Sequence, residues 1–130
     1  MKRVLLAHEL MAPQERGPGG RWLCRCGCRQ ECAGRRSWVS KAHVEDYLIR
    51  KGDIRTIRAA LRKRDHGMCA LCGQQVTTWD ADHTVPLAEG GHHGLDNLRT
   101  LCRACHAGET GRLAGRLAAG RRVKRKGGLT

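Results

Sequence analysis

The segment WDADHTVPL, residues 79–87, places two aspartates and a histidine close together and follows them with a proline. Hydrolysis of a phosphodiester requires a base that activates water and a cation that offsets the charge developing on phosphorus and on the leaving oxygen. A histidine such as His83 suits the first task, and carboxylate and imidazole ligands such as Asp82 and His106 suit a divalent cation. The amide of Asn97 could hold the base in place. These residues are the candidates for chemistry.

Two Cys-x2-Cys turns, CALC and CRAC, flank this segment. Each turn can direct two thiolates to one point, and four thiolates form the closed tetrahedral shell of a structural zinc. Disulfides are the alternative, but pairs so close in sequence make strained bridges, and a reducing compartment would open them. Because all four positions are filled, this zinc would take no part in catalysis. The sequence therefore predicts a structural zinc bound by four residues, namely Cys69, Cys72, Cys102 and Cys105.

The stretch WLCRCGCRQEC contains the other four cysteines within nine residues. A second zinc is predicted here, and the alternative is a cysteine-rich loop with free thiols. The pairing is left open, with five candidate ligands: Cys24, Cys26, Cys28, Cys32 and His43.

The elements that must position these groups are short. Residues 41–51 and 53–64 have helical periodicity and are parted at Gly52, with Asp53 as the expected N-cap of the second helix. We expect one strand around residues 75–79, a second around 81–87, and a helix that begins near the last cysteine pair. In a regular strand Asp82 and His83 would face opposite sides, so we expect a twist or bulge there.

The expected strands and helices, together with the cysteine turns, predict a small zinc-stabilised α+β fold. The chain has 130 residues, no Phe, one Tyr and three Trp, so burial alone contributes little and metal binding would add folding energy. A formal charge of +13 favours nucleic acid as the partner first and an anionic membrane surface second. No apolar run reaches 18 residues, which argues against a membrane-spanning protein. No small-molecule substrate is indicated.

The motifs CALCG, WDADHTVPLAEGG, LDNLRTLC and CRACH resemble those of the HNH endonucleases over about residues 62–110. The resemblance implies a ββα-metal, treble-clef-like core that cuts DNA. It implies that His83 is the general base, that Asp82 and His106 bind Mg²⁺ or a similar divalent ion, and that Asn97 orients the base or joins the metal shell. In some relatives a cysteine module with WCS and a further Cys precedes the nuclease; here that stretch reads WVSKAH.

Many relatives carry a Lys shortly after CH, whereas this chain reads CHAGET. Three arginines are therefore the candidates for phosphate contacts: Arg99, Arg103 and Arg112. Alternatives for single residues are a surface His83 paired with Asp80, and a loop position facing solvent for His92 and His93.

The chain divides into five expected segments. They are a flexible leader over residues 1–20, a cysteine-rich zinc module over 21–45, a basic connecting helix over 46–64, an HNH nuclease domain over 65–112, and a basic helix end and tail over 113–130, the last ten residues being disordered. We expect a cytoplasmic protein of a bacterium or a phage-infected cell. The alternative functions are a non-catalytic zinc-stabilised DNA-binding protein and an RNA nuclease, and the DNA specificity and oligomeric state are left open.

Overall fold

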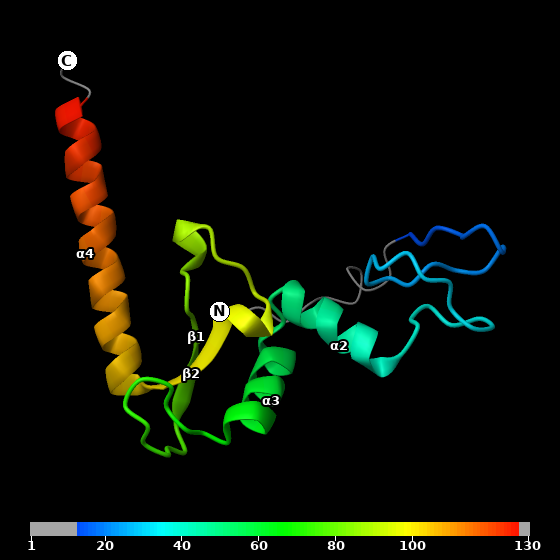
Figure 1. Cartoon of the computed structure of the whole chain (residues 1–130), viewed down its shortest axis with the longest axis horizontal. Helices are drawn as coiled ribbons and strands as arrows, with labels where there is room; N and C mark the ends of the chain where they lie inside the picture. Colours follow the sequence, from blue (N-terminus) through cyan, green and yellow to red (C-terminus); the bar gives the residue numbers. More distant parts are fainter. Residues whose placement is uncertain (1–12, 128–130) are drawn as a thin grey trace.

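An antiparallel hairpin lies at the centre of the molecule, between helices α3 (Ile54–Asp65) and α4 (Arg103–Gly127) (Figure 1). In the computed structural model, which describes residues 13–127, strand β1 (Trp79–His83) pairs with strand β2 (Leu98–Cys102) from Trp79↔Cys102 to His83↔Leu98. The pairing is one to one throughout, so of the expected twist or bulge, the bulge is absent from β1. Asp82 and His83 are the last two residues of β1, and both line one cavity.

The fold class is confirmed, and its order remains strand, strand, helix, but the strand positions differ from the prediction. Residues 75–78 do not form a strand, because Val76 N–H donates to Gly67 O and Gln75 bridges only Met68, which closes the first cysteine turn; of the predicted range only Trp79 belongs to β1. The true second strand, β2, was missed because it passes directly into a helix with no turn residue between them.

The main core lies between the hairpin and two helices, α2 (Lys41–Arg50) and α3 (Ile54–Asp65). Ile57 and Leu61 of α3 are fully buried, and they cluster with Trp79, Leu98 and Ile49. The predicted N-cap is confirmed: Asp53 accepts a hydrogen bond from Thr56 N–H at 3.1 Å. The helices therefore hold the hairpin from one side.

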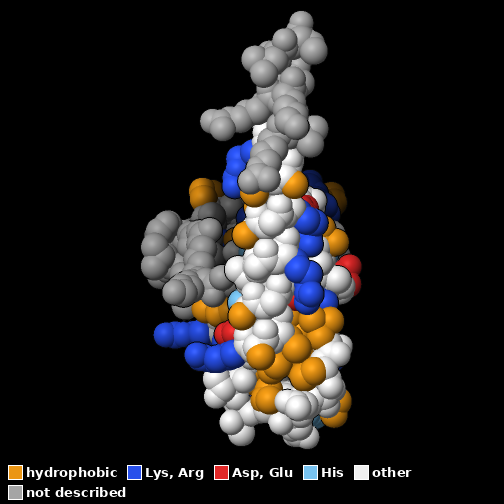
Figure 2. All heavy atoms as spheres, turned by 90° about the vertical axis from the view of Figure 1, so that its left-hand side faces the viewer, with side chains coloured by type: hydrophobic (Ala, Val, Ile, Leu, Met, Phe, Trp, Pro, Cys, Tyr) orange, Lys and Arg blue, Asp and Glu red, His pale blue; other side chains and the backbone are white. Residues whose placement is uncertain are grey.

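Helix α4 (Arg103–Gly127) follows β2 without a break and extends past the hairpin (Figure 1). Figure 2, which looks onto this helix, shows Lys and Arg side chains on both of its sides. Disorder was expected after residue 120, but α4 continues to Gly127, so that expectation is wrong for residues 121–127. The Arg and Lys residues that suggested a solvated tail are also good helix formers. Residues 128–130 of that tail lie outside the described residues. Among the described helices, none combines the length and the apolar character needed to cross a bilayer.

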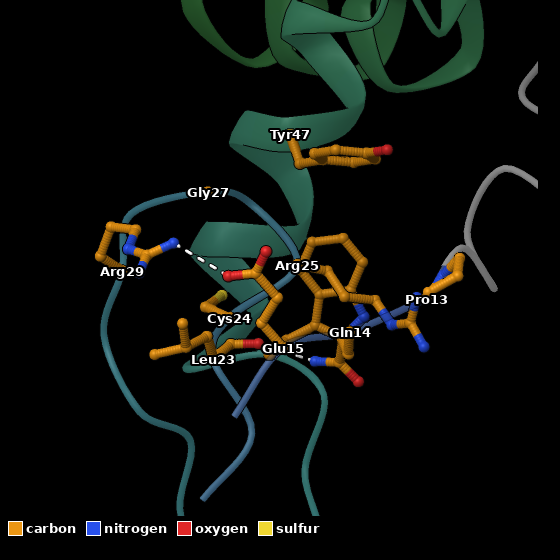
Figure 3. A pocket seen from close by; sticks show the side chains of 10 residues that line it. Pro13, Gln14, Glu15, Leu23, Cys24, Arg25, Gly27, Arg29 and Tyr47 are labelled. Carbon is orange, nitrogen blue, oxygen red and sulfur yellow. Dashed lines mark hydrogen bonds and ion pairs between the residues drawn. The ribbon is translucent and has the colours of Figure 1, made fainter. Parts of the chain in front are cut away.

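The cysteine-rich segment packs against α2. Buried Cys24, Cys26 and Cys32 contact Trp38, Val39 and Tyr47. Part of the expected leader belongs to this module, since the Gln14 amide donates to Leu23 O at 2.8 Å and Ser37 O at 3.0 Å. Residues 1–12 of the leader lie outside the described residues. Figure 3 shows the small cavity beside Cys24, across which Arg29 pairs with Glu15.

Candidate active site and metal centres

The four cysteines of the two Cys-x2-Cys turns converge on one point. Their sulfur atoms all lie within 4.8 Å of one another. Cys69 and Cys72 come from the turn after α3, Cys102 ends β2, and Cys105 lies in the first turn of α4. This cluster could hold a metal such as zinc, and an ion there would join the first turn to the junction of β2 and α4.

The electrostatics of this cluster favour a cation. Burial opposes the thiolate of Cys69, but hydrogen bonds from the backbone N–H groups of Cys72, Cys102 and Leu71 outweigh burial and lower its pKa to about 6. The sulfur of Cys102, followed by burial, raises the pKa of Cys105 to about 12. Several thiolates this close repel one another, and a divalent cation removes that repulsion.

A second cluster lies in the amino-terminal module and contains Cys24, Cys26, Cys28 and His43, whose ligand atoms also lie within 4.8 Å of one another. The Nδ1 atom of His43 is 3.2 Å from Cys26 Sγ. Burial, followed by the neighbouring Cys28 thiol, raises the pKa of Cys26 to about 12. Cys32 is buried near Cys24 but is not part of this group. The cluster could hold a metal in a Cys3His shell.

Asp82, His83 and His106 line one cavity of about 280 Å³. Its walls are the end of β1, the segment that follows it, and the part of α4 up to Arg116, which also contributes Glu109. The three residues that the sequence singled out for base and cation chemistry therefore share a cavity, although they come from two elements.

His106 is held between two aspartates. Its Nδ1 lies 3.2 Å from Asp80 Oδ2, and its Nε2 lies 3.7 Å from Asp82 Oδ1. Asp80 therefore pairs with His106, and not with His83 as the alternative for that residue supposed. When Nδ1–H donates to Asp80, the Nε2 lone pair faces the carboxylate of Asp82, an arrangement typical of metal-binding histidines.

Arg99 occupies the other side of Asp82. Its Nε donates to Asp82 Oδ2 at 2.8 Å, and its Nη2 lies 3.4 Å from Glu109 Oε2. Its side chain is only 19% exposed, so Arg99 is bound to acidic groups, in contrast to the phosphate contact expected of it. Arg103 is exposed, and Arg112 pairs with Glu109. Arg116, which the sequence did not suggest, pairs with Glu89 and lines the cavity.

His83 contacts a histidine that sequence reasoning placed in solvent. The Nε2 atom of His83 lies 3.1 Å from Nδ1 of His93. Burial, followed by the nearby His93, lowers the pKa of His83, and burial also lowers that of His93. The neutral, proton-accepting form of His83 is therefore favoured. The only signal for His93 was its place in the loop that closes the hairpin carrying His83.

Asn97 is buried and acts on the loop between the strands, residues 84–97. Its Oδ1 accepts from Val85 N–H at 2.8 Å, and its Nδ2 donates to Val85 O at 3.0 Å and His92 O at 2.8 Å. The amide thus holds together the segment that follows His83 and the segment that carries His93.

One comparison with known proteins concerns the segment that carries this geometry. The model of the HNH endonuclease family matches residues 69–112. A stretch of 38 residues is 34% identical to Anaredoxin from Nostoc sp. (strain PCC 7120 / SAG 25.82 / UTEX 2576), covering 29% of this chain and 50% of that protein. The chain thus spans about half the length of this relative. No solved structure matches the chain. The segment that brings together the four-cysteine cluster, Asn97 and His106 is therefore the part of this chain that matches the HNH endonuclease domain.

Proposed function

We propose that this chain is a metal-dependent endonuclease that hydrolyses DNA phosphodiester bonds. The observation that carries the proposal is the shared cavity of Asp82, His83 and His106 inside the HNH domain. A cavity of about 280 Å³ lined by ionisable groups suits a phosphate of the backbone and its attacking water. The charge of +13 supports a polyanionic partner.

His106 and Asp82 would hold the catalytic cation. The donor set fits, because Asp80 engages Nδ1 of His106 and Arg99 engages one oxygen of Asp82, so that Nε2 and Oδ1 remain directed at each other. Two protein ligands leave positions for water and phosphate oxygens, as Mg²⁺ prefers. When bound, the cation supplies positive charge against the phosphate and the leaving oxygen.

His83 would act as general base. Its lowered pKa keeps the ring neutral near pH 7, so it can accept a proton from water. The water oxygen then bonds to phosphorus in line with the leaving group, and the bond from phosphorus to the 3′ oxygen breaks. Solvent returns a proton to that oxygen, and the products carry a 5′-phosphate and a 3′-hydroxyl.

Zinc would occupy both cysteine clusters and serve the structure. The four-cysteine cluster joins three segments of the HNH domain, and the Cys3His cluster joins residues 24–28 to α2. We further propose a cytoplasmic location, because reduced thiolates are the form that binds zinc. Exposed Arg103 and the cavity-lining Arg116 are the arginines that we propose for phosphate contacts.

The test is a nicking assay on supercoiled plasmid with Mg²⁺ or Mn²⁺. His83→Ala should abolish nicking while zinc content and DNA binding stay unchanged. His92→Ala is the matched control, because this histidine lies in the same domain but its side chain is 62% exposed. Equal nicking by the His83→Ala variant rules out the assigned base. If the unaltered chain binds the plasmid but does not nick it, the protein is a non-catalytic DNA-binding protein. If it cuts RNA and not DNA, it is an RNA nuclease.

A further inference from the structure

The loop histidine His93 meets the imidazole of His83 in a defined geometry. The distance from His83 Nε2 to His93 Nδ1 is 3.1 Å, and the two ring centroids are 5.1 Å apart with planes tilted by 59°. This is the distance of a hydrogen bond, and the tilt rules out simple stacking of the two rings. One nitrogen of the base is therefore already engaged.

Two parts of the fold hold His93 at this place. Gly52, buried at the junction of α2 and α3, lies so close that a Cβ added there would be 2.9 Å from His93 Nε2. On the other side, the Asn97 amide donates to the carbonyl of His92, the residue directly before His93. A larger residue at position 52 or a loosened loop would move the ring. His93 is thus held between Gly52, at the junction of α2 and α3, and the part of the loop that Asn97 clamps.

This contact selects which nitrogen of His83 can accept a proton. With Nε2 in the bond to His93, only Nδ1 is available to water. Nδ1 accepts a proton only if the neutral ring carries its own proton on Nε2, so Nε2–H must donate to His93 Nδ1. His93 must then be neutral, with its proton on its own Nε2. Without an acceptor at this place, the neutral ring of His83 would divide between its two tautomers.

We propose that His93 is a positioning residue that holds His83 in the Nε2–H tautomer and leaves Nδ1 free for water. This inference rests on the proposed role of His83 as general base, and it names a residue outside the two metal clusters and the Asp82–His106 pair. His93 is not among the residues that line the cavity of Asp82, His83 and His106, so its effect on the reaction would pass through His83.

Three substitutions of the zinc-loaded chain separate positioning from simple packing. His93→Ala removes the acceptor. His93→Asn restores an acceptor oxygen near the position of Nδ1, whereas His93→Gln carries its acceptor further out, near the position of Nε2. His92→Ala again serves as the control, because its ring is largely exposed and accepts its hydrogen bond from Gly94 N–H.

The first readout is ¹⁵N NMR of histidine-labelled protein at alkaline pH, with the His83 signals assigned by their loss in His83→Asn. We expect the Nε2–H tautomer in the unaltered chain, the His92→Ala control and His93→Asn, and a mixture of tautomers in His93→Ala and His93→Gln. An Nδ1–H ring in the unaltered chain, or an unchanged tautomer in His93→Ala, overturns the proposal. This readout does not depend on cleavage, so it stands even if the chain proves inactive on DNA.

The second readout is the nicking rate. His93→Ala should lower kcat about tenfold, the equivalent of one hydrogen bond, with little change in KM, and His93→Asn should recover most of the loss. Equal losses in His93→Asn and His93→Gln would indicate packing alone and overturn the positioning role. If the tautomer shifts as expected but no variant cuts, the proposed function fails while the positioning contact remains.

Discussion

Replacing Asn97 by alanine tests how the loop between the two strands is held. The substitution removes three hydrogen bonds, which join the side chain to both backbone groups of Val85 and to the carbonyl of His92. A hydrogen bond contributes about 0.5–1.5 kcal/mol net, and water reaches part of this loop, so we expect a loss of about 2–3 kcal/mol. Asn97 is buried, and thus relaxation around the shortened side chain is limited.

Amide hydrogen exchange measures this loss where it occurs. In Asn97→Ala the protection of the Val85 amide should fall by roughly 30- to 150-fold, which is the same energy expressed as an equilibrium. In Asn97→Asp the Val85 amide should be no better protected than in Asn97→Ala near pH 7, because a carboxylate oxygen replaces the Nδ2 donor and faces the carbonyls of Val85 and His92. Asp96→Ala is the matched control, since the neighbouring side chain is 80% exposed. Unchanged Val85 protection in Asn97→Ala, or full protection in Asn97→Asp, would refute the clamp.

Three further outcomes are expected. Chelation of zinc, or the substitution Cys102→Ser, should unfold the HNH domain, as followed by circular dichroism. Cys32→Ser lies outside both ligand groups and should leave the metal content unchanged in native mass spectrometry; loss of an ion in that variant would show that Cys32 is a ligand. Because burial lowers the pKa of His83 and His93, protonation favours the unfolded chain, and the free energy of unfolding should fall as the pH drops through the unfolded pKa of about 6.5. In urea titrations, a variant with both His83→Asn and His93→Asn should show a smaller fall; the same dependence on pH in both proteins would contradict this expectation. A Cβ added at Gly115 or Gly120 meets no atom within 4 Å, so Gly115→Ala and Gly120→Ala should each stabilise α4 by about 1 kcal/mol. At Gly91 the added methyl group would clash with the Val85 carbonyl, so Gly91→Ala should destabilise the loop; a different ranking of the three variants in thermal melts would refute this.

Local chemistry was predictable from the sequence wherever covalent spacing dictates it. Two residues between cysteines place both sulfurs on one side of a turn, so the four-thiol cluster could be predicted from the cysteine spacing in CALC and CRAC. The break at Gly52 and the cap at Asp53 are also local, since each depends on backbone torsions and on neighbours within one helical turn. The grouping of Asp82, His83 and His106 was expected from the family motifs, and their shared cavity agrees with it.

Partners across the fold were not predictable in the same way. Strand β2 contains charged and apolar residues in a run of five, and only its pairing with β1 distinguishes it from the start of α4. Arg99 was expected to contact phosphate, yet the register places it opposite Asp82, where their opposite charges pair. The sequence does not contain the register, so it could not reveal this pairing.

The sequence by itself determined the ligand types, the two helices before the hairpin with the cap at Asp53, and the basic charge, because each follows from residue identity and from neighbours along the chain. Only the tertiary structure decided that Asp80 holds His106, that Asn97 clamps the loop and that His93 meets His83. These contacts join residues 5 to 26 positions apart, and their formation depends on how the loop returns across the hairpin and on the space left at Gly52. Side-chain partners at such separations are set by packing in three dimensions, which local spacing does not specify.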